Sequence, residues 1–124
     1  MIHEEICTYE VCKLAKKKGF NVQTFDWYDY AGNYHKGFIP HKLYECPRYK
    51  EHYAPTQSLL QRWLREEKGI IIELKYSDST ESWRPFWSWI IYNNLGITLE
   101  IGDNSSTYEL ALEDALKCAL ENLV

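Results

Sequence analysis

Two aspartates and a histidine in the first third of the chain have the spacing best suited to acid–base chemistry. Asp26, Asp29 and His35 lie in a segment rich in β-forming residues, where a hairpin could bring a carboxylate beside an imidazole. A regular strand, however, places residues 26 and 29 on opposite faces, which argues against a shared acid–base site. We therefore interpret both carboxylates as solvated groups at a strand edge and a turn, and the sequence predicts no catalytic residue.

Several histidines and cysteines have the right chemistry for metal ligands. Structural zinc sites usually contain two closely spaced ligand pairs, and the spacings in this chain do not match that pattern. With no secretory segment, the cysteines are expected to remain reduced thiols. We therefore predict no metal site, although the residues that could contribute ligands are the pair Cys7 and Cys12 and the group His35, His41, Cys46 and His52.

Composition and motifs exclude several classes of function. The six glycines stand singly, so no glycine-rich phosphate loop is present, and neither G-x-S-x-G nor H-E-x-x-H occurs. Fourteen Lys and Arg residues against 18 Asp and Glu residues give a net charge of −4, which argues against a general polyanion binder. The sequence predicts no cofactor and no membrane span. The first seven residues lack the apolar core of a secretory signal, so we expect a cytoplasmic protein.

The N-terminal part predicts a helix followed by a hairpin. Thr8 can cap a helix over residues 9–18 that Gly19 ends, and the lysines at 16–18 complement the negative end of its dipole. Residues 21–36 predict a β-hairpin that turns at residues 31–33. Residues 38–55 show no periodicity, and they form either a packed surface loop or a functional one.

The C-terminal part has a clearer pattern. It predicts a helix over residues 56–68, strands at 70–77, 86–92 and 97–101, and a last helix that Ser106 opens with Glu109 in a capping box. The expected fold is α+β, a two-layer sandwich with an antiparallel sheet and helices on one face, in the order α-β-β-(long loop)-α-β-β-β-α. We expect a single domain, 1–124, with an α-β-β subunit at 1–37, an irregular loop at 38–55 and a core at 56–124.

The turn at residues 93–96 predicts which sheet face is buried. An even-length turn pairs Tyr92 with Ile97 and Ile90 with Leu99. The face expected beneath the helices then carries Phe86, Ile90, Tyr92, Ile97, Leu99 and Ile101. The residues expected to be buried in one core are Leu60, Trp63, Leu64, Ile72, Leu74, Ile90, Leu99, Leu112, Ala115 and Leu116.

The same parity places Trp87, Trp89 and Ile91 on the opposite, mostly polar face. Three explanations are open for large apolar side chains in that position: the N-terminal hairpin covers them, a second copy of the chain covers them, or a partner or ligand does. We take these three residues as the candidate partner-binding site, because a buried tryptophan is a typical interface anchor.

Three segments resemble a known group of proteins. They are Pro55-Thr56-Gln57-Ser58-Leu59-Leu60-Gln61-Arg62-Trp63-Leu64-Arg65-Glu66-Glu67-Lys68-Gly69-Ile70, the ending Tyr108-Glu109-Leu110-Ala111-Leu112-Glu113-Asp114-Ala115-Leu116-Lys117, and the opening helix from Thr8 to Lys18-Gly19-Phe20. Together they resemble short uncharacterised proteins of bacteriophages and mobile elements of gut anaerobic bacteria. That family has no established activity, so the resemblance assigns no functional residue. We expect a non-enzymatic protein-interaction module, with a protein partner or a homodimer.

Two alternatives are a nucleic-acid-binding domain and a small enzyme of unknown class. The α-β-β-β-α order of residues 56–124 resembles the double-stranded-RNA-binding domain in outline. From residue 56 onward, however, six Lys and Arg residues stand against eleven Asp and Glu residues, a balance of −5. The last helix opens with Glu109 where that family has a lysine cluster, and a carboxylate there would repel phosphates. Nucleic acid is therefore not the expected partner.

Overall fold

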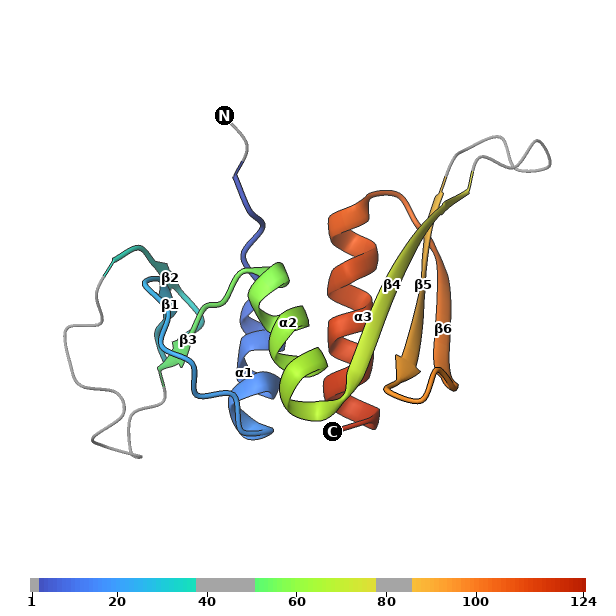
Figure 1. Cartoon of the computed structure of the whole chain (residues 1–124). Coiled ribbons are helices and arrows are strands. Elements are labelled where there is room, and N and C mark those ends of the chain that lie inside the picture. Colours follow the sequence, from blue (N-terminus) through green and yellow to red (C-terminus); the bar gives the residue numbers. More distant parts are fainter. Residues whose placement is uncertain (1–2, 38–50, 78–85) are drawn as a thin grey trace.

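The computed structural model describes residues 3–37, 51–77 and 86–124, and it has an α+β fold with antiparallel sheets, as the sequence predicts (Figure 1). The elements in chain order are α1 (Tyr9–Lys17), β1 (Trp27–Tyr28), β2 (Tyr34–His35), β3 (His52–Tyr53), α2 (Gln57–Lys68), β4 (Ile70–Ser77), β5 (Phe86–Asn93), β6 (Thr98–Ser105) and α3 (Tyr108–Asn122). Within the described residues, no helix is long and apolar enough to cross a membrane.

Each helix begins at a threonine whose hydroxyl caps it. Thr8 Oγ1 accepts from Val11 N–H at 3.4 Å in α1, and Thr56 Oγ1 accepts from Leu59 N–H at 3.2 Å in α2. Such a bond satisfies one of the backbone donors that a helix start leaves unpaired. In α3 the cap is Thr107 instead of Ser106, one residue later than predicted. Local sequence signals therefore placed every helix start to within a residue.

The strands form two separate sheets instead of the single sheet that the sequence suggests. Sheet β4-β5-β6 has the three long strands, and a small sheet has the order β2-β1-β3. Strand β3 lies in the segment expected to be irregular, and it pairs with β1 through Trp27 and Tyr53. Figure 1 shows the helices between the two sheets, with all three on one side of β4-β5-β6. The hairpin β1-β2 therefore lies on the far side of the helices from β5 and does not cover its tryptophans.

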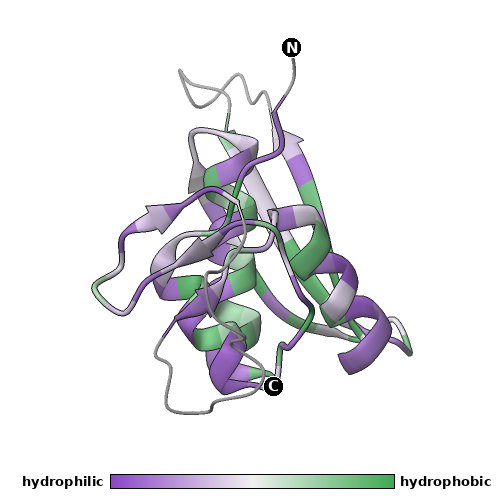
Figure 2. Cartoon of the chain, turned by 90° about the vertical axis from the view of Figure 1, so that its left-hand side faces the viewer, coloured by the Kyte–Doolittle hydropathy of each residue, from purple (hydrophilic) through white to green (hydrophobic). Residues whose placement is uncertain are grey.

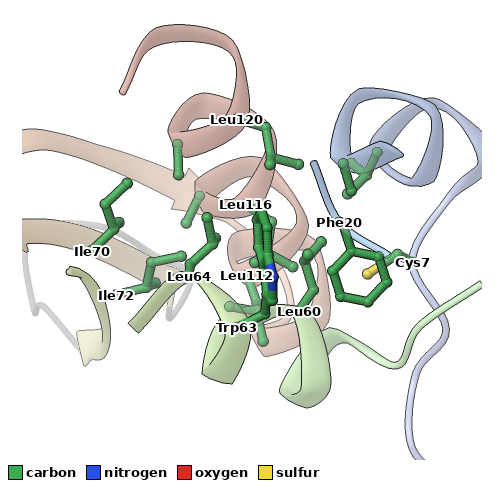
Figure 3. Packing of buried hydrophobic residues seen from close by; sticks show 14 of the residues in the cluster. Cys7, Phe20, Leu60, Trp63, Leu64, Ile70, Ile72, Leu112, Leu116 and Leu120 are labelled. Atoms are coloured by element: carbon green, nitrogen blue, oxygen red, sulfur yellow. The ribbon is translucent and has the colours of Figure 1, made fainter. Parts of the chain in front are cut away.

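The core lies where α2 and α3 face each other and sheet β4-β5-β6. Figure 3 shows Leu60 and Trp63 of α2 beside Leu112 and Leu116 of α3, with Phe20 on the N-terminal side. Figure 2 shows hydrophobic and hydrophilic segments alternating along the helices, as expected for helices with one buried face. Of the predicted core, these residues are buried: Leu60, Trp63, Leu64, Ile72, Leu112, Ala115 and Leu116. Leu74 is half-buried and packs against this cluster.

The prediction of which face of β5 lies beneath the helices is wrong. Strand β5 pairs with β4 so that Ile91 lies opposite Ile72 and Trp89 opposite Leu74, which turns the tryptophan face toward the helices. Trp89 is 8% exposed and Ile91 is fully buried. Burying large apolar side chains stabilises the fold by about 1.5–3 kcal/mol each, so the face with the bulkier residues is the one covered.

The register between β5 and β6 differs from the predicted one because the turn that joins them has a different length. The loop has three residues, since Asn93 N–H donates to Ile97 O at 2.9 Å and Gly96 takes a positive φ of 80°. A bulge at Leu99 then shifts the pairing, so that Ile90 lies opposite Ile101. The residues wrongly expected beneath the helices are Phe86, Ile90 and Tyr92, which are half-exposed, and Ile97, Leu99 and Ile101, which are exposed.

Candidate functional site

The outer face of sheet β4-β5-β6 is not covered by any described helix or strand (Figure 1). Neighbouring strands bring four apolar side chains together on it: Ile71, Ile90, Tyr92 and Ile101. Ile71 lies opposite Tyr92, and Ile90 lies between Glu73 and Ile101. Ile101 is 69% exposed, which is unusual for a β-branched aliphatic residue in a strand. We call these four residues the apolar sheet patch.

Charged residues flank the apolar sheet patch. Glu73 and Lys75 follow Ile71 along the same face of β4, and Asp103 follows Ile101 on β6. Desolvation, followed by the nearby Glu73 carboxylate, raises the pKa of Tyr92. A hollow of about 470 Å³ overlaps the patch at Ile90 and Ile101, and its lining also includes Lys75, Ser88 and Asp103. The face therefore combines apolar contact area with charges of both signs on β4 and a carboxylate on β6.

The structure does not place the predicted partner-binding residues on this face. Trp89 and Ile91 are buried, and Trp87 is half-buried, all on the helix side of the sheet. The indole of Trp89 lies against the backbone of Gly102, and the ring of Trp87 contacts Tyr108 edge-on, with centroids 5.2 Å apart. These side chains belong to the core, because the pairing of β5 with β4 turns them inward. The hypothesis that they bind a partner is therefore not retained.

The structure does bring Asp29 and His35 together in the N-terminal hairpin. His35 Nε2 lies 2.8 Å from Asp29 Oδ2, and the imidazole stacks on Trp27. Asp29 Oδ1 also accepts from the backbone N–H groups of Ala31 and Asn33. These hydrogen bonds, His35 first, lower the pKa of Asp29 to about 2. Because this carboxylate is occupied in holding the turn, its role is structural.

Asp26 takes part in a separate set of contacts. Its Oδ2 accepts from the hydroxyl of Tyr34, and its Oδ1 accepts from Gly37 N–H at 3.3 Å. Burial, together with this bond, raises the pKa of Tyr34 to about 12. The two aspartates thus hold different parts of the hairpin and do not converge with His35 on one point.

The candidate metal ligands do not form a site within the part of the chain that the structure describes. No group of three His, Cys, Asp or Glu side chains gathers there, and His41 and Cys46 lie outside the described residues. Cys7 and Cys12 are both buried, and burial raises the pKa of each thiol well above its usual value. Two such thiols are unreactive at neutral pH.

Sequence reasoning missed the contacts that join the helices. Glu113, which the helical pattern places on the polar face of the last helix, accepts from Thr8 N–H at 2.7 Å and from Gln57 Nε2 at 2.8 Å. Lys18 Nζ donates to the carbonyl oxygen of Val124 at 2.9 Å, and Lys16 Nζ to that of Glu51 at 2.8 Å. Lys16 in the last turn of α1 and Lys18 at its C-cap thus make tertiary contacts beyond the helix-dipole role, and no local signal identifies such partners.

Comparisons with known proteins do not assign this chain to a family. No family model matches it, and no solved structure matches it. The chain is similar to the tRNA N6-adenosine threonylcarbamoyltransferase of Mycoplasma pneumoniae, with 26% identity over 99 residues. The match covers 70% of this chain and 31% of that enzyme, so the chain spans less than a third of its length.

Proposed function

We propose that this chain is a cytoplasmic, non-enzymatic interaction module of the phage-protein type that its sequence resembles, and that it pairs with a second copy through the apolar sheet patch. The observation that carries the proposal is the exposure of Ile101 beside Ile90, on a sheet face that no described element covers. An apolar patch rimmed by charges is typical of a protein contact surface.

The arrangement of the face favours a second copy because it is self-complementary. If a two-fold axis runs along β5 between two facing sheets, Ile90 lies over Ile90 and Tyr92 over Tyr92 of the second copy. The same operation places β4 over β6, which brings Lys75 toward Asp103 on the other chain. Two-fold symmetry thus matches apolar with apolar residues along β5 and Lys75 with Asp103 at the rim, while Glu73 falls over Ile101 of the second copy.

The size of the face sets the expected strength of this pairing. Three strands of eight residues each cover about 26 by 14 Å, or roughly 400 Å² per copy. Stable interfaces bury about 800 Å² per partner, so the face alone supports a weak dimer in rapid exchange. The association should therefore depend strongly on protein concentration.

Sedimentation velocity from micromolar to millimolar protein tests the proposal, and we expect the sedimentation coefficient to rise with concentration. Ile101→Asp should abolish the rise, because it replaces the most exposed apolar residue of the patch by a carboxylate that would face Glu73 of the second copy, without disturbing the core. Leu95→Asp is the matched control, since Leu95 is 79% exposed in the β5-β6 turn and lies off the patch. A wild-type chain that stays monomeric throughout, or equal effects of both substitutions, would overturn the proposal.

A further inference from the structure

A hollow of about 560 Å³ lies beside α1 and β3, on the far side of the helices from the apolar sheet patch (Figure 1). Three lysines of α1 and one histidine of β3 contribute to its lining: Lys13, Lys16, Lys17 and His52. Glu10, Leu14 and Glu121 complete it. Four nitrogen-bearing side chains from two elements thus surround one space.

The two carboxylates of the hollow share one lysine of α3, which offsets one of their two negative charges. Lys117 Nζ lies 3.0 Å from Glu10 Oε1 and 3.9 Å from Glu121 Oε1. Lys16 donates to the main-chain oxygen of Glu51, whose carboxylate also acts on it electrostatically. Among the described residues, Lys13 and Lys17 form no ion pair. With three lysines in its lining, Lys117 beside it and three carboxylates in all, the hollow keeps an excess of about one positive charge.

His52 lies in this positive field with an unsatisfied nitrogen. It is 8% exposed, its ring contacts Tyr9 edge-on with centroids 5.5 Å apart, and its Nδ1 has no hydrogen-bond partner among the described residues. Burial first, and then Lys16 and Lys13, lower the pKa of His52 to about 4. A buried polar atom without a partner in a native fold calls for an explanation, and a role in binding a ligand is one.

We propose that this hollow binds a phosphate group, with Lys13 and Lys17 as its ion-pair partners and the His52 imidazole as a neighbouring hydrogen-bond donor. Lysine ammonium groups are common phosphate ligands, and their spacing of four residues places both on one face of α1. The bound anion would offset the positive field at the imidazole. By thermodynamic linkage, anion binding and protonation of His52 then favour each other.

NMR titration of the His52 ring signals against pH tests this inference, with sodium phosphate as the probe and sodium chloride at equal ionic strength as the reference. We expect phosphate to raise the titration midpoint of His52. The double variant Lys13→Gln/Lys17→Gln should weaken phosphate binding by roughly five- to tenfold, as expected for two exposed ion pairs. Lys36→Gln, in the exposed hairpin, removes a lysine charge away from the hollow and is the control for each single variant, Lys13→Gln or Lys17→Gln; it should leave binding unchanged.

The phosphate group could belong to a nucleic-acid backbone or to a small phosphorylated molecule, and competition with a short single-stranded oligoribonucleotide distinguishes the two. If it displaces inorganic phosphate from the hollow, the natural ligand is a nucleic-acid backbone; if phosphate stays bound, the ligand is a small phosphorylated molecule. The inference is wrong if the titration midpoint of His52 is the same in phosphate as in chloride. It is also wrong if Lys36→Gln weakens phosphate binding as much as the double variant does. Neither result depends on whether the chain forms a dimer.

Discussion

Replacing Gly102 by alanine tests the contact that orients β5. A Cβ built at position 102 would lie 2.6 Å from Trp89 Nε1 and closer still to Cε2 and Cζ2 of the same ring. Non-bonded carbon atoms prefer separations of about 3.5–4.0 Å, so the indole would have to move by roughly 1 Å or more. Trp89 is 8% exposed and packed in the core, which leaves it little room to move.

The expected net effect of Gly102→Ala is destabilisation by about 1–2 kcal/mol. Overpacking a well-packed core costs about 1–3 kcal/mol. Replacing glycine by alanine also reduces the conformational freedom of the unfolded chain, which stabilises the fold by roughly 0.4–1 kcal/mol. Because alanine at a strand position without strain is normally neutral or stabilising, the sign of the change alone is informative. Urea unfolding followed by circular dichroism measures it.

A double-mutant cycle with Trp89→Leu separates the steric contact from other effects. With the indole removed, Gly102→Ala should become neutral or stabilising, which gives a coupling free energy of about 1–3 kcal/mol between the two sites. The reasoning is refuted if Gly102→Ala is as stable as the wild type, or if its effect is the same in both backgrounds. Either result would mean that the indole does not lie against this backbone.

Three further predictions concern the core, the helix contacts and pH. Leu116→Ala should lower the free energy of unfolding by ~2–5 kcal/mol in urea titrations, because Leu116 is fully buried. Glu113→Ala should cost ~2–3 kcal/mol by the same assay, since it removes the acceptor for Thr8 and Gln57, and Glu113→Gln should restore part of this. The pKa of His52 falls to about 4 in the folded chain. At a pH below the ordinary pKa of histidine, the unfolded chain therefore binds more protons than the folded chain. Stability should therefore decrease as pH falls from about 6.5 to 4, by up to ~1.4 kcal/mol per unit, and His52→Gln should flatten this dependence.

The sequence alone determined the helices and two of the three strands of the C-terminal part, because the signals that set them are local, whereas β6 extends to Ser105, four residues beyond the predicted strand at 97–101. Thr8 and Thr56 cap their helices through side-chain bonds that span three residues, and Gly69 ends α2 at a φ of 66°. The buried stripes of α2 and α3 follow the helical repeat, which is why Leu64 and Leu116 were correctly expected in the core.

The contacts that form the candidate sites were not available to local reasoning. Strand β3 is two residues long, and its pairing with β1 joins positions some 25 residues apart. His52 therefore gave no signal beyond its residue type, and the hollow beside it depends on helix α1 packing against that strand. Asp29 and His35 meet because the carboxylate lies in the turn, where the alternation of a strand no longer applies.

The buried face of β5 was decided only by the tertiary structure. Both faces of this strand carry large apolar residues, so its pattern is consistent with either orientation. Pairing with β4 aligns Trp89 and Ile91 with Leu74 and Ile72, and one contiguous apolar layer then meets α3. Ile90 and Ile101 are left on the outside as a consequence. A shift of one residue exchanges the two faces of a strand, so the register between strands determined which residues form the core and which form the candidate interaction surface.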